Sequence, residues 1–274
     1  MNFCYIDGLY RKPSEAYIPV TDLAIQRGVG VFETIRTYNR RPMALSMHLE
    51  RLQESARRCG IAMPLNIEKM NKIIRNGLSR FEEDARARPY ITGGDIEVAG
   101  QFPEGRFFVF FEPLNPPEDR LYKEGVTLLP IDTERPLPHI KSINYLQGYL
   151  PLRDGPEAIE ILYCPNGEIT EASHSNAFMV KGKEIITAPT SRVLAGTMRN
   201  MVIEIAKEAG FVVRERCPLV EELPEAAEFF ITGSVKEIMP VVKVGVTLIG
   251  KGRPGPVSQM LRHLYLQNLK RWLE

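Results

Sequence analysis

Seven residues near the middle of the chain interrupt any regular element that reaches them. They are Pro113-Leu114-Asn115-Pro116-Pro117-Glu118-Asp119, and proline is unfavourable both inside a helix and in a central strand. The chain has 274 residues, which is more than one hydrophobic core usually covers. We therefore expect a small N-terminal domain over residues 1–112, a linker at 113–119 and a large C-terminal domain over residues 120–274.

Both expected domains combine strand and helix patterns. In the first, apolar residues recur every three or four positions from Leu45 to Cys59, which predicts an amphipathic helix ended by Gly60. In the second, the run from Thr197 to Ala209 predicts another helix. Pro165-Asn166-Gly167 predicts a hairpin turn between strands at 158–163 and 168–171. The pattern indicates an α/β (α+β) fold.

Shorter signals complete the first domain. Asp7-Gly8 lies between two short β-rich runs and predicts a hairpin. Asn66 is expected to cap a second helix, and strands are expected near 88–92 and 106–112.

Charge and cysteine content exclude several classes of function. The net charge is +1, with 35 basic and 34 acidic residues interleaved, so nucleic acid is not an expected partner. The four cysteines lie far apart and form no CxxC pair, so neither a disulfide framework nor a metal site is expected. No secretory signal and no run long enough to span a membrane is recognised, which favours a reduced, cytoplasmic setting.

Lys141 is the first candidate for chemistry. Taken alone, a lysine is far more often a solvated loop residue than a catalytic one. Here it lies in the mostly apolar run His139-Ile140-Lys141-Ser142-Ile143, and poor solvation makes the neutral amine easier to form. A neutral amine is what imine formation with an aldehyde requires.

Glu171 follows the Asn-Gly turn and ends the expected hairpin. A carboxylate that faces a pyridine nitrogen keeps the ring protonated, and a protonated ring is the better electron sink. The alternative is an exposed glutamate at a strand end, which is the commoner case.

Two further segments suit a phosphate. Leu194-Ala195-Gly196-Thr197-Met198 opens the expected helix, and a helix start offers backbone N–H groups and a positive dipole end. Arg51 lies beside the buried stripe of the earlier helix, where its guanidinium could make a bidentate phosphate contact. The alternatives are an ordinary Gly-Thr cap and a snorkelling arginine.

Together these segments resemble the class IV, or fold-type-IV, family of pyridoxal-phosphate-dependent aminotransferases. The resemblance extends over nearly the whole chain, in the family's order. The segments that carry it are Gln26-Arg27-Gly28-Val29-Gly30-Val31-Phe32-Glu33, His48 to Leu52, Lys141 to Leu146, Thr170 to Asn176, Leu194 to Arg199 and Thr232 to Val241.

The resemblance implies a two-domain, D-amino acid aminotransferase-like fold, pyridoxal 5'-phosphate as cofactor and a homodimer with active sites near the interface. It makes Lys141, in the C-terminal domain, the Schiff-base lysine and Glu171 the partner of the ring nitrogen. The other cofactor-binding residues that it implies are Arg51 and Ser234 and the helix start at Gly196, Thr197 and Met198 for the phosphate, Leu194 for the ring face and Tyr145 for the phenolic oxygen.

Some positions depart from the family pattern. The helix start is usually Gly-Ile-Thr or Gly-Val-Thr, so Met198 supplies no hydroxyl, although its backbone N–H remains. His174 stands where the family has a small residue, and a hydrogen-bonded loop histidine is the favoured interpretation.

The substrate is expected to be a D-amino acid, with a 2-oxo acid as amino acceptor. The Lys-Ser-Ile-Asn spacing is closer to the D-amino acid and lyase branches than to the branched-chain enzymes. The usual carboxylate trap of the D-amino acid enzymes is missing, so Arg88, with Lys236 or Arg27, is the expected replacement. The alternatives are a branched-chain L-amino acid or R-amine transaminase, an aminodeoxychorismate lyase and a non-catalytic protein that keeps the fold.

Overall fold

The computed structural model describes residues 1–274, which form two compact units. The chain passes from the first unit to the second after Asn115, inside the proline-rich segment. Two short later segments also pack with the first unit. The first unit comprises Met1–Asn115, Ile140–Asn144 and Arg271–Glu274, and the second comprises Pro116–His139 and Tyr145–Lys270.

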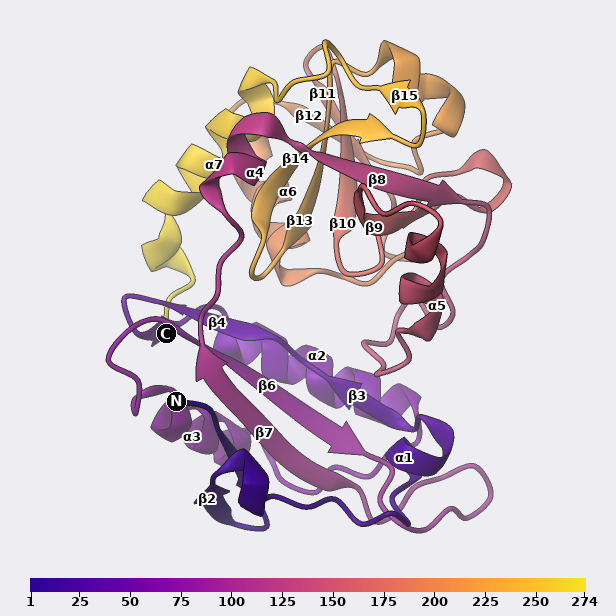
Figure 1. The fold of residues 1–274 in the computed structure, drawn as a ribbon. Coiled ribbons are helices and arrows are strands. Elements are labelled where there is room, and N and C mark those ends of the chain that lie inside the picture. Colours follow the sequence, from indigo (N-terminus) through magenta and orange to yellow (C-terminus); the bar gives the residue numbers. More distant parts are fainter. The chain divides into compact units, whose positions relative to one another are not determined.

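The first unit is built on a seven-stranded antiparallel sheet with the order β2-β1-β7-β6-β4-β5, in which β3 also pairs with β6 (Figure 1). The Asp7-Gly8 hairpin is confirmed, with Tyr5 opposite Tyr10. The strands are β1 (Phe3–Ile6), β2 (Leu9–Arg11), β3 (Gly30–Phe32), β4 (Ile35–Tyr38), β5 (Arg41–Pro42), β6 (Ala85–Thr92) and β7 (Arg106–Pro113).

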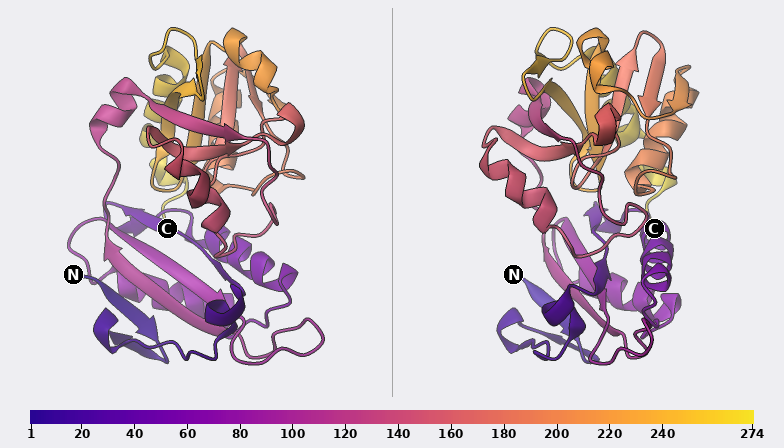
Figure 2. Two further views of the ribbon diagram at one scale, coloured as in Figure 1. Left: turned by 45° about the vertical axis from the view of Figure 1, so that its right-hand side comes forward. Right: turned by 90° about the vertical axis from the view of Figure 1, so that its right-hand side faces the viewer.

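Two helices, α2 (Leu45–Arg58) and α3 (Ile67–Leu78), cover one face of this sheet (Figures 1 and 2). Asn66 caps α3 as predicted, because its side chain accepts a hydrogen bond of 2.9 Å from the Lys69 N–H. The apolar stripe of α2 is fully buried, and each such leucine contributes about 1.5–3 kcal/mol relative to an exposed one. The opposite face of the sheet carries aromatic and charged side chains.

The second unit is built on an eight-stranded mixed sheet with the order β12-β11-β10-β13-β14-β8-β9, in which β15 also pairs with β14. The pairs β11–β12, β8–β14 and β8–β9 are parallel, and the others are antiparallel. The strands are β8 (Val126–Ile131), β9 (Ala158–Tyr163), β10 (Asn176–Lys181), β11 (Glu184–Thr187), β12 (Val212–Glu215), β13 (Glu228–Gly233), β14 (Glu237–Val244) and β15 (Thr247–Leu248).

Helices α6 (Thr197–Glu208) and α7 (Pro256–Gln267) pack on this sheet against β13 and β14. The α6 bounds agree with the predicted helix. The remaining helices are short: α1 (Leu23–Arg27), α4 (Asp119–Glu124), α5 (Leu146–Tyr149) and the 3-10 turns η1 (Pro13–Glu15), η2 (Leu150–Arg153), η3 (Pro165–Gly167), η4 (Val220–Glu225) and η5 (Leu269–Arg271).

One predicted strand is absent. Residues 168–171 form no regular strand, and Glu168 and Glu171 make isolated bridges to Leu219 and Asn176. The predicted pairing across the turn persists locally, because the Tyr163 N–H donates to the Glu171 carbonyl at 2.9 Å and the Thr170 N–H donates to the Tyr163 carbonyl at 3.0 Å. The turn at Pro165–Gly167 is a 3-10 turn with Asn166 at φ 52°, and the chain beyond it runs as a loop. This loop carries Glu171. No helix in either unit combines the length and the hydropathy that a membrane span requires.

Candidate active site

The segment with Lys141 was expected in the C-terminal domain, but Ile140–Asn144 packs in the first unit, along β3. The Phe32 N–H donates to the Lys141 carbonyl at 3.0 Å, and the Ile143 N–H donates to the Gly30 carbonyl at 3.1 Å. Gly28 makes this approach possible. Its φ is +70°, and a Cβ atom there would lie 2.5 Å from Asn144 Oδ1.

The backbone of Lys141 is held from both sides. Its N–H donates to Ser55 Oγ on α2 at 3.3 Å, while its carbonyl is held by β3. The Lys141 Nζ atom lies 4.8 Å from the centroid of the Phe32 ring. Helix α2 and strand β3 therefore hold the Lys141 backbone, and the half-buried side chain places its amine over the Phe32 ring.

Arg51 belongs to a buried charge cluster on α2. Its Nε and Nη2 atoms donate to the two carboxylate oxygens of Glu33 at 2.7 and 2.8 Å. His48, one turn earlier on the same helix, contacts Glu33 Oε2 through Nδ1 at 2.7 Å. Glu33 is fully buried, so this bidentate contact fixes the plane of the Arg51 guanidinium.

The cluster holds one negative and one positive charge. Burial alone favours the neutral acid, but Arg51 and His48 outweigh it and keep the pKa of Glu33 well below its usual range. Burial lowers the pKa of His48, and the nearby positive charges of Arg51 and Lys141 lower it further. Glu33 raises this pKa, but by less than the other effects lower it. His48 is therefore neutral at neutral pH and donates its Nδ1–H to Glu33.

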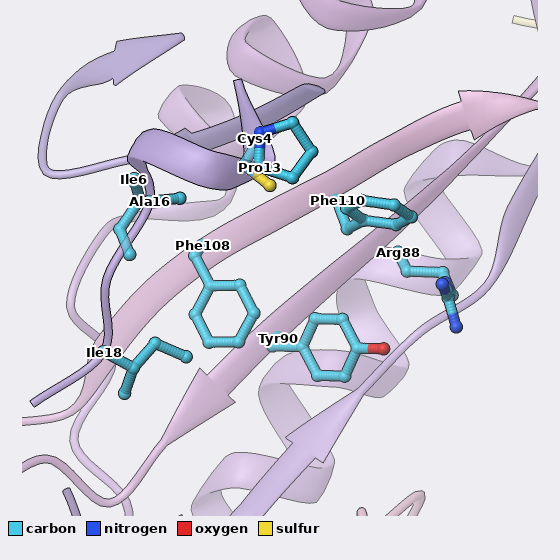
Figure 3. Close-up of a pocket in the computed structure, with 9 residues that line it drawn as sticks. All are labelled: Cys4, Ile6, Pro13, Ala16, Ile18, Arg88, Tyr90, Phe108 and Phe110. Atoms are coloured by element: carbon cyan, nitrogen blue, oxygen red, sulfur yellow. The ribbon is translucent and has the colours of Figure 1, made fainter. Parts of the chain in front are cut away.

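Arg88 lies on the sheet face opposite α2. One of its Nη atoms contacts Glu112 Oε1 at 3.1 Å, whereas its Nε–H is buried without a hydrogen-bond partner. It borders a pocket of about 310 Å³, and Figure 3 shows its guanidinium at the edge of an aromatic floor made by Tyr90, Phe108 and Phe110. Tyr90 also stacks on Phe32, with ring centroids 5.6 Å apart. An apolar pocket thus adjoins a cation with unused donor capacity.

Arg27 is the last residue of α1 and is exposed. Its Nη1 atom donates to the Gln26 carbonyl at 2.9 Å. The helix itself is anchored by Asp22, whose side chain accepts from the Ala24 N–H and from Thr92 Oγ1 at 2.8 and 2.7 Å. This hydrogen bond joins the Arg27 guanidinium only to the neighbouring residue of the chain, and it does not hold the side chain against a buried group.

In the second unit, Glu171 is buried and has several donors. Arg135 Nη1 donates to its Oε1 at 2.9 Å, and the Leu194 N–H and Asn176 Nδ2 lie 3.2 and 3.3 Å from its Oε2. Burial opposes the charge of Arg135, but the neighbouring Glu171 outweighs it and raises the pKa of Arg135. The donors and the nearby cation favour an ionised Glu171.

Of the residues expected to bind phosphate, Gly196, Thr197 and Met198 form the start of α6 in this unit, whereas Arg51 lies in the first unit. No side chain caps α6, and its first residues Thr197 and Met198 are buried. A Cβ on Gly196 would overlap Asn176 Oδ1, so only glycine allows this approach. The hydroxyl of Thr232, opposite Asn176 in the sheet, is buried without a partner. Such an uncapped helix start with an unused hydroxyl fits a phosphate group.

Ser234 and Lys236 lie in the turn between β13 and β14. The Lys236 ammonium contacts Glu160 Oε1 at 2.6 Å. Tyr145 stacks on His174, with ring centroids 4.8 Å apart and planes 15° apart. His174 was expected to be a hydrogen-bonded loop residue, and its Nδ1 does lie 2.9 Å from Ser173 Oγ.

Sequence reasoning assigned no role to Arg135 or Glu160. Glu160 had a detectable signal, since it is an acidic residue in the otherwise apolar strand β9. No local sequence pattern indicates the role of Arg135, because its contact with Glu171 joins positions 36 residues apart. Glu33 and His48 were noted only as parts of longer motifs.

The chain was compared with known families and proteins. The family model described as amino-transferase class IV matches residues 30–244. A putative branched-chain-amino-acid aminotransferase of Methanocaldococcus jannaschii is 30% identical, over 98% of this chain and 96% of that protein. A D-alanine aminotransferase of Bacillus licheniformis is 29% identical, over 92% of each.

A solved structure is also similar. The branched-chain amino acid aminotransferase of Escherichia coli superposes with a TM-score of 0.87 at 25% identity. The match covers 97% of this chain and 93% of that one. The similarity therefore extends through both units.

Proposed function

Because this chain belongs to the class IV aminotransferases and depends on pyridoxal phosphate, we propose that it transfers amino groups between D-amino acids and a 2-oxo acid. The fold and the cofactor expected from the sequence are confirmed by the family match. Both D-alanine and branched-chain aminotransferases are among the relatives, so the substrate has to be argued from the residues.

We assign the cofactor contacts residue by residue. Lys141 would bind the cofactor's aldehyde carbon through Nζ and move the substrate's α-proton. Glu171 would hold the proton on the ring nitrogen, Tyr145 would donate to the phenolic oxygen, and Leu194 would pack on the ring. The phosphate ligands would be Arg51, Ser234 and the helix start at Gly196, Thr197 and Met198. When bound, pyridoxal phosphate withdraws electrons from the substrate's α-carbon.

The D-amino acid proposal rests on the Lys-Ser-Ile-Asn spacing of the Lys141 segment. The Arg88 guanidinium at the edge of the aromatic pocket is the candidate partner for the substrate carboxylate, which D- and L-amino acids share. A carboxylate that enters an enclosed site loses hydration, which charged hydrogen bonds restore. Arg88 lines the pocket and pairs with the partly buried Glu112 at 3.1 Å, whereas Lys236 is held at 2.6 Å by the fully buried Glu160. We therefore rank Arg88 first for the substrate carboxylate and Arg27 second.

A branched-chain L-amino acid transaminase is the competing function. The similarity to the M. jannaschii and E. coli proteins favours it, and the apolar walls of the pocket also suit an aliphatic side chain. The two functions differ in the stereochemistry of the amino donor and therefore can be separated directly.

The test is a panel of D-alanine, L-leucine and R-phenylethylamine, each with 2-oxoglutarate. We expect turnover of D-alanine. A second test is the Arg88→Ala variant, because removing the charged partner of a buried carboxylate typically costs about 2–5 kcal/mol. Arg88→Ala should therefore lower kcat/KM for D-alanine roughly 30- to several-thousand-fold, at tenfold per 1.36 kcal/mol. It should spare R-phenylethylamine if that amine is a substrate, because it has no carboxylate.

Arg86→Ala is the matched control, because Arg86 lies on the same strand and also pairs with Glu112, at 2.7 Å. It should change kcat/KM for D-alanine much less. Turnover of L-leucine alone would overturn the D-amino acid proposal. Equal losses of acid and amine turnover in Arg88→Ala would make Arg88 a structural residue.

We also propose that borohydride reduction traps the cofactor on Lys141 and that the enzyme is a homodimer. Peptide mapping that finds the cofactor on another lysine would remove the assignment of Lys141. Light scattering of the active enzyme should give twice the 31.1 kDa chain mass, and a fully active monomer would contradict the dimer.

A further inference from the structure

Glu160 is a fully buried carboxylate. Neither the family match nor the proposed reaction assigns a role to it. It lies on β9, in the run Ala158–Tyr163, and none of its surface is exposed. A charge in such a place is costly unless it is paired and hydrogen-bonded. Its partners therefore indicate what it is for.

Those partners come from two separate loops. Oε1 contacts the Lys236 ammonium at 2.6 Å and accepts from Ser175 Oγ at 2.7 Å. Oε2 accepts from the His174 backbone N–H at 2.7 Å and from Ser173 Oγ at 3.5 Å. Residues 173–175 follow Glu171, and Lys236 follows Ser234.

The two loops also make contacts with three tyrosines. The His174 ring stacks on Tyr145 and lies 3.3 Å, through Nε2, from the Tyr149 hydroxyl. The turn with Lys236 is also held by Tyr122, whose hydroxyl donates to the Lys236 carbonyl at 3.1 Å. One carboxylate thus joins the loop that carries Glu171 and the turn that carries Ser234.

We propose that Glu160 is a positioning residue, which uses its ion pair with Lys236 to fix the ring-nitrogen loop relative to the phosphate turn. The proposal rests on the cofactor roles assigned above to Glu171 and Ser234. Burial disfavours the charged form, but Lys236 outweighs it and keeps the pKa of Glu160 below its usual value. The carboxylate therefore stays ionised, and Lys236 acts as its counter-ion.

A double-mutant cycle tests this coupling, because residues that act as a pair show non-additive effects. The variants are Glu160→Gln, Lys236→Met and the double variant. The first readout is the affinity of the apo-protein for pyridoxal 5'-phosphate and, separately, for pyridoxal. Pyridoxal lacks the phosphate, so only the complete cofactor engages both loops at once. The second readout is the melting temperature of the apo-protein.

Each single variant should weaken pyridoxal 5'-phosphate binding about 10- to 100-fold, if the loss resembles that for the outer partners of metal ligands. The loss for pyridoxal should be smaller, and the double variant should be less impaired than the sum of the two single changes. The matched control is Lys243→Met, since Lys243 pairs with the exposed Glu157 at 3.5 Å and should leave both affinities unchanged.

Three results would overturn the proposal. They are additive effects of the two substitutions, equal losses of affinity for both ligands, and a Lys236→Met variant that changes only the KM for the amino acid. If Glu160→Gln does not fold, Ser175→Ala removes one donor without changing the charge and should give a smaller loss of the same kind. These outcomes concern cofactor binding, so they are separate from the D- or L-specificity that tests the proposed function.

Discussion

In the first unit Glu33 holds Arg51, and in the second unit Arg135 holds Glu171. Both pairs join a buried carboxylate to a guanidinium, at 2.7 and 2.9 Å. The proposed cofactor ligand, however, is the arginine in the first pair and the glutamate in the second. In our proposal, the same interaction would orient a phosphate ligand in one unit and the partner of the ring nitrogen in the other.

The difference also concerns the local backbone. Glu33 directly follows strand β3, and Arg51 lies on the long helix α2. Strand and helix both pack into the hydrophobic core of the first unit. Glu171 and Arg135 both lie outside the regular elements. The Glu171 backbone is held by an isolated bridge to Asn176 and by a hydrogen bond from the Tyr163 N–H, at 2.9 Å. We infer that the first pair is part of the stable framework, whereas the second depends on contacts between loops. The predictions below separate these two situations.

The largest effect is expected from Glu171→Gln. The variant keeps the shape of the side chain but cannot hold a proton on the ring nitrogen by its charge. The rate constant for transamination should fall roughly 100- to 10,000-fold, the range for loss of a positioned acid or base, while cofactor binding persists. Stopped-flow half-reactions measure the loss. Glu168→Gln, in the same loop and with its side chain 42% exposed, is the control and should be unaffected.

A smaller effect, on stability, is expected from Glu33→Gln. It leaves the mostly buried Arg51 without its carboxylate, and breaking a buried ion pair typically costs about 3–5 kcal/mol. Urea unfolding of the apo-protein should show this loss, and Arg51→Met should recover part of it in the double variant. Glu54→Gln on the same helix removes only exposed contacts with Arg57 and Arg58 and should leave stability unchanged. An equal response of the two variants would remove the distinction between framework and surface pairs.

The sequence predicted the regular elements well because their signals are local. The spacing of Leu45, Leu49, Leu52 and Ala56 determines which face of α2 is buried, and the fold class follows from such patterns. The family was indicated instead by the resemblance of six motif segments in the family's order. The same spacing places Arg51 beside the buried stripe. Its bidentate contact with Glu33 could not be predicted, because it joins positions 18 residues apart across two elements.

The loops are harder to predict for the same reason. Residues 168–171 have strand-like composition, but they make isolated bridges to Leu219 and Asn176 and two backbone hydrogen bonds with Tyr163 instead of a regular ladder. Lys141 follows the linker by more than 20 residues of sequence, yet its segment packs with the first unit. Gly28 leaves room there for the Asn144 side chain. A boundary read from prolines cannot detect such a return of the chain. The roles of the individual site residues stay predictions.

The smallest predicted effect sharpens the comparison through pH, because the first cluster contains a histidine and the Arg135–Glu171 pair does not. Burial lowers the pKa of His48 from its ordinary value of 6.5. Below that pH the unfolded chain binds a proton that the folded chain does not, so stability falls as the pH falls. Glu33 also has a lowered pKa, but its contribution is lost only below about pH 4.5, where the unfolded carboxyl is protonated.

Between pH 7 and pH 5, the pH dependence of the free energy of unfolding therefore reports on His48 and not on Glu33. The expected slope is at most about 1.4 kcal/mol per pH unit, the value for one proton. His48→Asn should flatten this part of the curve, because the asparagine amide can still donate to Glu33 but does not titrate. The exposed His263 on α7 is the matched control, and His263→Asn should keep the slope. If His48→Asn keeps it as well, His48 is charged in the folded protein, and the cluster holds two cations around Glu33 instead of one.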